Sequence, residues 1–127
     1  MNSHIESKEN VEMFLNNLQI ILKDNNFNIV KNFTMNNTSP KNTQTLLDLD
    51  YNTEDIKDKL ELLKVSDYYE TVPDNKYPDK PDFYVFFILI KKREIYIKVS
   101  IRGYNNHVLC MSFHYAEFSH KALPYMN

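Results

Sequence analysis

The segment EIYIKVSIRGYNNHVLCMSFH carries tyrosine, lysine, serine and histidine at alternating positions of two predicted strands. Successive side chains of a strand point to opposite faces, so Tyr96 and Lys98 share the polar face of the first strand. Ser112 and His114 share the polar face of the second. If residues 103–107 form the turn, Tyr96 pairs with His114, and Lys98 pairs with Ser112. The four side chains should then lie together on a rigid sheet.

Such a cluster has the components for metal-free cleavage of RNA. Attack by the 2′-OH needs a base for its proton, an acid for the leaving 5′-oxygen and a cation for the phosphorane charge. His114 titrates near neutrality, and Lys98 and Arg102, which lies further along the same face, are cations. Tyr96 could donate a hydrogen bond or stack on a base. A half-exposed strand face can also carry polar residues without any catalytic role, and the pattern alone leaves both interpretations open.

Other chemistries find less support in the sequence. A lone glycine, Gly103, cannot build the Gly-rich loops that cradle phosphates. A lone cysteine, Cys110, can form neither an internal disulfide nor a zinc cluster. The set His114, Glu117 and His120 lacks the helical His-Glu-x-x-His spacing, and the end of a strand would splay these side chains apart. We therefore expect no metal and no cofactor.

Composition bounds the class of protein. The chain has 127 residues, enough for a single domain spanning 1–127. A net charge of −2 and a pI near 6.1 argue against a strongly basic nucleic-acid binder, so any RNA contact needs a local basic patch. No apolar run approaches the roughly 18 residues of a membrane span, and the N-terminus does not resemble a secretory signal. These features predict a cytoplasmic protein with no membrane partner.

The first part of the chain should form helices. Apolar residues at helical spacing predict a helix that follows Ser7 as its N-cap and ends near residues 25–26. Alternation predicts an edge strand over 27–35, and a polar connector containing Pro40 follows. A second helix is expected within 45–69, capped by Asn52 or Thr53.

The second part should form an antiparallel meander. Three prolines mark an irregular loop, the apolar run FYVFFILI predicts a central strand, and the two strands of the polar cluster complete the sheet. The apolar face of those two strands should comprise Ile95, Ile97, Val99, Ile101, Leu109, Met111 and Phe113. The expected fold class is α+β, with two N-terminal helices packed on an antiparallel sheet.

The motifs TLLDLD, DYYE, EIYIKV, MSFHYAEF and PYMN, in this order, resemble the MqsR family of type II toxins over nearly the whole chain. The resemblance implies a RelE-like fold and a metal-independent endoribonuclease that cleaves single-stranded mRNA and is neutralised by a cognate antitoxin. It assigns catalysis to Tyr96, Lys98 and His114, which match the Val/Ile-Tyr-x-Lys strand and the basic residue after Ser-Phe. Arg102 and Ser112 are expected to bind substrate.

Departures from the family pattern favour a second interpretation. Tyr84, the third expected substrate-binding residue, stands where related sequences carry Trp, and Ile88 and Glu70 stand where they carry Lys. Two cationic positions are thus apolar or acidic. The alternative function is a toxin-like, catalytically inactive protein-binding inhibitor of the kind that phages encode.

Overall fold

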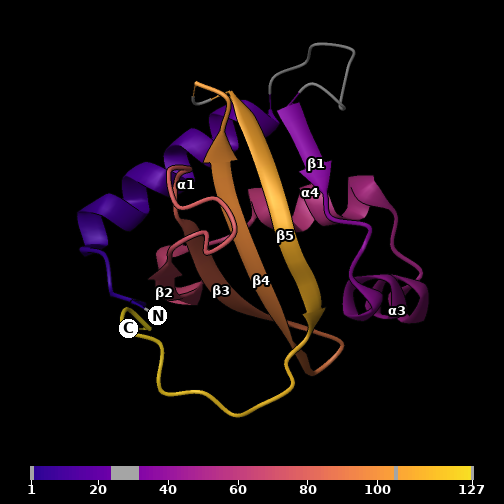
Figure 1. Ribbon diagram of the computed structural model, residues 1–127. Coiled ribbons are helices and arrows are strands. Elements are labelled where there is room, and N and C mark those ends of the chain that lie inside the picture. Colours follow the sequence, from indigo (N-terminus) through magenta and orange to yellow (C-terminus); the bar gives the residue numbers. More distant parts are fainter. Residues whose placement is uncertain (1, 24–31, 105, 127) are drawn as a thin grey trace.

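The protein is described by a computed structural model of residues 2–23, 32–104 and 106–126. Within these ranges it has an α+β fold (Figure 1), as predicted. The helices are α1 (Lys8–Leu22), α3 (Pro40–Leu49), α4 (Thr53–Glu61) and the short 3-10 helix η1 (Val65–Asp67). The strands are β1 (Phe33–Met35), β2 (Tyr68–Val72), β3 (Phe83–Ile90), β4 (Arg93–Arg102) and β5 (His107–Tyr115). The predicted end of the first helix near 25–26, and the strand positions 27–31, lie outside the described residues.

The five strands form one sheet in the order β1-β5-β4-β3-β2. β2, β3, β4 and β5 form the antiparallel part, whereas β1 runs parallel to β5. The sheet is therefore mixed, and the prediction of an antiparallel sheet was wrong for its first strand. Parallel pairing joins segments far apart in the chain, so the local sequence carries no signal for it. β1 does lie at an edge, as predicted.

The helical part also differs from the prediction. The expected polar connector begins a third helix, because Ser39 accepts a hydrogen bond from the backbone of Asn42 and Pro40 occupies the first turn. The second helix, predicted within 45–69, forms in two parts: residues 45–49 belong to α3, and α4 follows, where Asn52 and Asp55 cap each other's backbone reciprocally. Its expected C-terminal end is instead η1 and the strand β2. No helix among the described residues is long and apolar enough to cross a membrane.

One face of the sheet, covered by α1 and α4 (Figure 1), holds the hydrophobic core. Ser7 caps α1 as predicted, and the apolar stripe of that helix packs on the strands. Phe14 lies flat against Tyr84 of β3, with ring centroids 3.9 Å apart. The predicted inward residues of β4, Ile95, Ile97, Val99 and Ile101, are buried. The opposite face, called the outer face below, carries the polar side chains of β4 and β5 and three buried apolar residues of β3, Phe83, Val85 and Phe87.

A β-bulge divides the pairing of β4 with β5. Tyr96 pairs with His114 and Lys98 with Ser112, as predicted, but Val99 pairs with Cys110, which leaves Met111 as the extra residue. The prediction that Met111 and Leu109 point into the core was wrong: Val108 and Cys110 are fully buried instead, together with Phe113.

The turn explains this difference. Gly103 and Tyr104 both have left-handed backbone angles, with φ near 60° and 57°. Arg102 consequently pairs with His107, so the turn is one residue shorter than expected. The bulge then restores the original alternation, and the polar face beyond it is the predicted one.

Helix α3 replaces a neighbouring strand along the second half of β5. β1 pairs with β5 only as far as Cys110. Beyond it, the side-chain amide of Asn42 donates to the carbonyl of Met111 at 3.0 Å and accepts the N–H of Phe113 at 3.0 Å. Thr45 accepts the N–H of Tyr115 at 3.2 Å. Backbone groups freed by the bulge and by the end of β1 are thereby satisfied.

The opposite edge of the sheet is also covered. The N-terminal segment pairs with β2 through two backbone hydrogen bonds between His4 and Thr71, at 2.9 and 2.8 Å. The hydroxyl of Tyr125 donates to the carbonyl of Glu6 at 2.6 Å and brings the C-terminal segment beside the N-terminal one. Both ends of the chain therefore meet next to β2 (Figure 1).

Candidate functional site

Four aromatic side chains form a row across the outer face of the sheet, one from each antiparallel strand. Tyr69 of β2 meets Phe87 of β3 edge-on, with ring centroids 5.3 Å apart, and Phe87 meets Tyr96 of β4 edge-on at 5.6 Å. Tyr96 in turn stacks on His114 of β5 at 5.2 Å, with an interplanar angle of 21°. We call these four residues the aromatic row. Such a platform is suited to contact with unpaired bases.

His114, at one end of the row, is held in a defined orientation. Its Nδ1 lies 2.9 Å from the carbonyl oxygen of Tyr115. Because a carbonyl can only accept, Nδ1 carries the hydrogen and the Nε2 atom of the neutral ring has a lone pair. Burial raises the pKa of the adjacent Tyr96, so its hydroxyl remains a donor at neutral pH. The pairing predicted from sequence alternation therefore places the basic ring nitrogen of His114 on the same face as the phenol of Tyr96.

Lys98 and Ser112 form the next pair along the same strands. The Lys98 ammonium lies 4.9 Å from the centroid of the Phe83 ring. Burial lowers the pKa of Lys98, and the charge of Asp74 partly opposes this effect. Lys98 is thus a half-buried cation on the outer face, and its ammonium lies over Phe83, at the end of β3 away from Phe87.

Arg102 is engaged within the protein. Its guanidinium pairs with Asp74 at 3.0 Å, donates to Ser100 at 2.8 Å and to the Pro81 carbonyl at 3.1 Å. The two paired side chains are 14% and 7% exposed. Burial would raise the pKa of Asp74, but backbone donors and Arg102 outweigh it and lower that pKa. Arg102 therefore fastens the proline-rich loop to the sheet, and its charge is largely neutralised there.

Tyr84 does not join the other predicted site residues. Its position on β3 pairs with Val99, so its side chain points to the helix-covered face and stacks on Phe14. Burial raises its pKa to about 12. Tyr84 is a core residue at the edge of α1, on the far side of the sheet from His114.

A pocket of about 390 Å³ opens beside the aromatic row, between β5 and the segment that follows it. Lys41 of α3 reaches into it and binds Glu117 through an ion pair of 2.6 Å. His120, from the same segment, lies over Phe87. No local sequence pattern indicates Lys41, whose position depends on how Asn42 binds the bulge. Phe87 could have been found, because the tight turn after β3 sets it opposite Tyr96.

The three residues considered as metal ligands are engaged separately. Nδ1 of His114 faces a carbonyl, Glu117 pairs with Lys41, and His120 pairs with Glu94 at 2.7 Å. Within the described ranges, no three His, Cys, Asp or Glu side chains are grouped as metal ligands would be.

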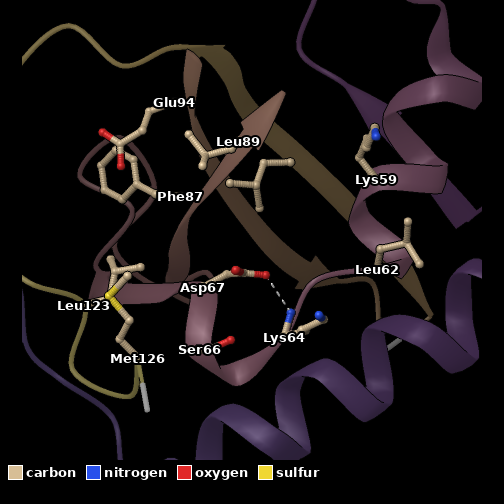
Figure 2. A pocket seen from close by; sticks show the side chains of 11 residues that line it. Lys59, Leu62, Lys64, Ser66, Asp67, Phe87, Leu89, Glu94, Leu123 and Met126 are labelled. Atoms are coloured by element: carbon tan, nitrogen blue, oxygen red, sulfur yellow. Dashed lines mark hydrogen bonds between the residues drawn. The ribbon is translucent and has the colours of Figure 1, made fainter. Parts of the chain in front are cut away.

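A second hollow, of about 630 Å³, lies on the other side of Phe87 (Figure 2). It is lined by Phe87 and Leu89 of β3, by Glu94 of β4, and by Leu123 and Met126 of the C-terminal segment. Phe87 is therefore the wall shared by both hollows, and the C-terminal segment passes along it.

Comparisons of this chain with protein-family models, with curated proteins and with solved structures return no match. The resemblance to MqsR toxins accordingly rests on the sequence motifs and stays a proposal.

Proposed function

We propose that this protein is an MqsR-like toxin with a RelE-like fold, a metal-independent endoribonuclease that cleaves single-stranded mRNA in the cytoplasm. A cognate antitoxin would neutralise it. The observation that carries the proposal is the pair formed by His114 and Tyr96 on the outer face, with Nδ1 of His114 held by a carbonyl. A histidine so fixed has one nitrogen for proton transfer, and the row beside it offers stacking surfaces for bases.

In this mechanism Nε2 of His114 removes the proton of the 2′-OH as its oxygen attacks phosphorus. The P–O5′ bond breaks, and the same proton is available for the departing 5′-oxygen. Tyr96 orients the substrate by its hydroxyl or its ring. Lys98, helped by Ser112, stabilises the negative charge of the phosphorane. The products are a 2′,3′-cyclic phosphate and a 5′-hydroxyl end.

The test is cleavage of end-labelled single-stranded RNA by purified protein in excess EDTA, with analysis of the new termini. We expect cleavage to persist and the 3′ ends to carry a cyclic phosphate or its hydrolysis product. His107→Ala serves as a matched histidine control, because His107 begins the same strand at its far end. Activity lost on chelation and restored by zinc or magnesium would overturn the mechanism.

One observation favours the second candidate, a catalytically inactive protein-binding inhibitor. Arg102, expected to bind phosphate, is paired with Asp74, and Lys98 is partly buried. Both reduce the positive potential available to an RNA backbone. RNA that stays intact with wild-type protein, at concentrations where the protein binds a partner encoded beside it, would select this candidate.

A further inference from the structure

The ring of His120 contacts the ring of Phe87 in a different orientation from the two neighbouring tyrosine rings. Tyr69 and Tyr96 meet Phe87 edge-on, at 82° and 69°. His120 instead lies face to face with it, at 3.9 Å and 20°. Phe87 is only 7% exposed although it belongs to the outer face. One face of the Phe87 ring is thus covered by an aromatic heterocycle.

The edge of the same heterocycle is hydrogen-bonded. Nε2 of His120 lies 2.7 Å from a carboxylate oxygen of Glu94, and Nδ1 lies 2.6 Å from the carbonyl of Lys121. Both acceptors bind ring N–H groups in the plane of the ring. A flat ring stacked on an aromatic side chain, with an in-plane N–H donated to a carboxylate, is also how proteins hold unpaired nucleobases.

The residues that precede His120 in the C-terminal segment lie at the surface. Glu117, Phe118 and Ser119 are exposed, and Phe118 retains 82% of its accessible surface. Glu94 itself remains 41% exposed, so its carboxylate can be approached from solvent. His120 can therefore leave Phe87 without disturbing the buried core.

We propose that Phe87 and Glu94 form a binding site for one unpaired nucleobase, which His120 occupies in the absence of RNA. Phe87 stacks on the base and Glu94 accepts a hydrogen bond from its N–H or amino edge. This inference rests on the proposed function, because it names a subsite for the RNA that His114 would cleave. Phe87 reaches His114 through a single intervening ring, Tyr96, so the base bound there lies close to the scissile phosphate.

Binding can be measured separately from cleavage with a fluorescein-labelled 2′-O-methyl oligoribonucleotide, which lacks the attacking hydroxyl. Phe87→Leu keeps an apolar side chain but removes the π-face, so the Kd should rise about fivefold or more. His120→Ala vacates the site and should lower the Kd about tenfold, as expected where the open state is a minor one. Ile20→Ala is the control, because Ile20 is 70% exposed on α1, which covers the other face of the sheet. Its Kd should match that of the wild type.

The outcomes separate this site from the proposed nuclease. Cleavage of RNA by the wild type with an unchanged Kd for Phe87→Leu would overturn the base site and leave the nuclease standing. Binding that depends on Phe87 in a protein that never cleaves RNA would support the base site and overturn the nuclease. Failure of both the wild type and His120→Ala to bind the oligonucleotide would overturn the base site. The contact of His120 with Phe87 and Glu94 would then serve only to hold the C-terminal segment.

Discussion

His114 owes its orientation to the carbonyl oxygen of the residue that follows it. This bond keeps Nδ1 protonated, so Nε2 is the nitrogen that can accept a proton. The neighbouring Phe113 points the other way and is fully buried. The proposed chemistry therefore depends on His114 and the stability of the fold on Phe113, although the two residues are adjacent in the chain.

We predict that His114→Ala lowers the rate of RNA cleavage about 10²–10⁴-fold, the usual contribution of a positioned acid or base. The free energy of unfolding should fall by no more than about 2 kcal/mol, because only the stacking on Tyr96 and one part-buried hydrogen bond to the Tyr115 carbonyl are lost. Phe113→Ala should instead cost about 3–5 kcal/mol through the cavity it leaves. Single-turnover cleavage and urea denaturation measure the two effects. A His114→Ala protein that is unfolded, or fully active, would remove His114 from the mechanism.

The ion pair between Arg102 and Asp74 supports a second prediction, about stability. Asp74→Ala leaves a largely buried guanidinium without its partner and should lower the free energy of unfolding by about 3 kcal/mol. Asp79→Ala, at an exposed position of the same loop, is the control and should change it little.

The pH dependence of this effect follows from the lowered pKa of Asp74. A carboxyl whose pKa is lower when folded contributes stability above its unfolded pKa, near 4, and loses it as the pH falls through the folded pKa. The difference between wild type and Asp74→Ala should therefore be full at pH 7 and shrink in strong acid. A difference that grows below pH 4 would contradict the assignment.

At the scale of the elements, side chains of α3 supply hydrogen-bond partners to the part of β5 that has no neighbouring strand on that side. Asn42 is 1% exposed and satisfies both the carbonyl of Met111 and the N–H of Phe113. Asn42→Ala leaves the buried N–H of Phe113 without its partner, whereas the Met111 carbonyl keeps a bond from the side chain of Asn36 at 3.2 Å. A buried group without a partner costs about 1–3 kcal/mol, and we expect a loss of this size in the free energy of unfolding, measured by denaturation.

Gln44→Ala, on the exposed side of the same helix, tests whether this loss is specific. It changes helix propensity by a similar small amount but breaks no bond to β5. Equal losses for the two variants would mean that the amide of Asn42 is not what holds α3 to the bulge.

The C-terminal segment gives a prediction about pH. Burial disfavours the charged ring of His120, but hydrogen bonds to Glu94 and to the Lys121 carbonyl outweigh it and raise its pKa. Tyr69 also contacts the ring, and the charged residues Glu117 and Lys41 line the adjoining pocket. The net effect is a raised pKa, so protonation of the His120 ring favours the docked segment.

A group with a raised folded pKa stabilises the folded state fully below its unfolded pKa, near 6.5, and loses this contribution as the pH rises through the folded value. NMR titration of the His120 ring should therefore give a pKa above the ordinary one. Glu94→Gln should lower it while leaving the titration of His107 unchanged. An ordinary pKa in the wild type would show that the contact with Glu94 does not hold in solution.

For the whole molecule, the proposed function predicts arrest of growth. Induction of the gene in a bacterial host should stop growth and fragment transcripts, and co-expression of a neighbouring antitoxin gene should relieve both effects. His114→Ala should restore growth at equal protein levels. Normal growth of cells making the wild-type protein would favour the inhibitor.

Sequence reasoning succeeded where the pattern is local. Alternation along β4 gave its buried face, and the pairing of Tyr96 with His114 is confirmed. It failed where long-range contacts decide the structure. The parallel pairing of β1 and the partnership of Arg102 with Asp74 join distant segments, and the bulge at Met111 depends on a turn whose length alternation does not report. No periodicity reports such contacts, so Arg102 looked like a free cation and Met111 like a core residue.

The covered edges of the sheet bear on how the protein behaves when many copies meet. Growth of cross-β assemblies needs a long, straight row of unpaired backbone groups that another copy can extend. Here β1 offers three residues, α3 fills the rest of that side, and His4 bridges Thr71 on the other. Crowded copies thus lack a template for fibril growth along the described edges. Concentrated samples should therefore stay free of amyloid even though the chain is rich in aromatic strands.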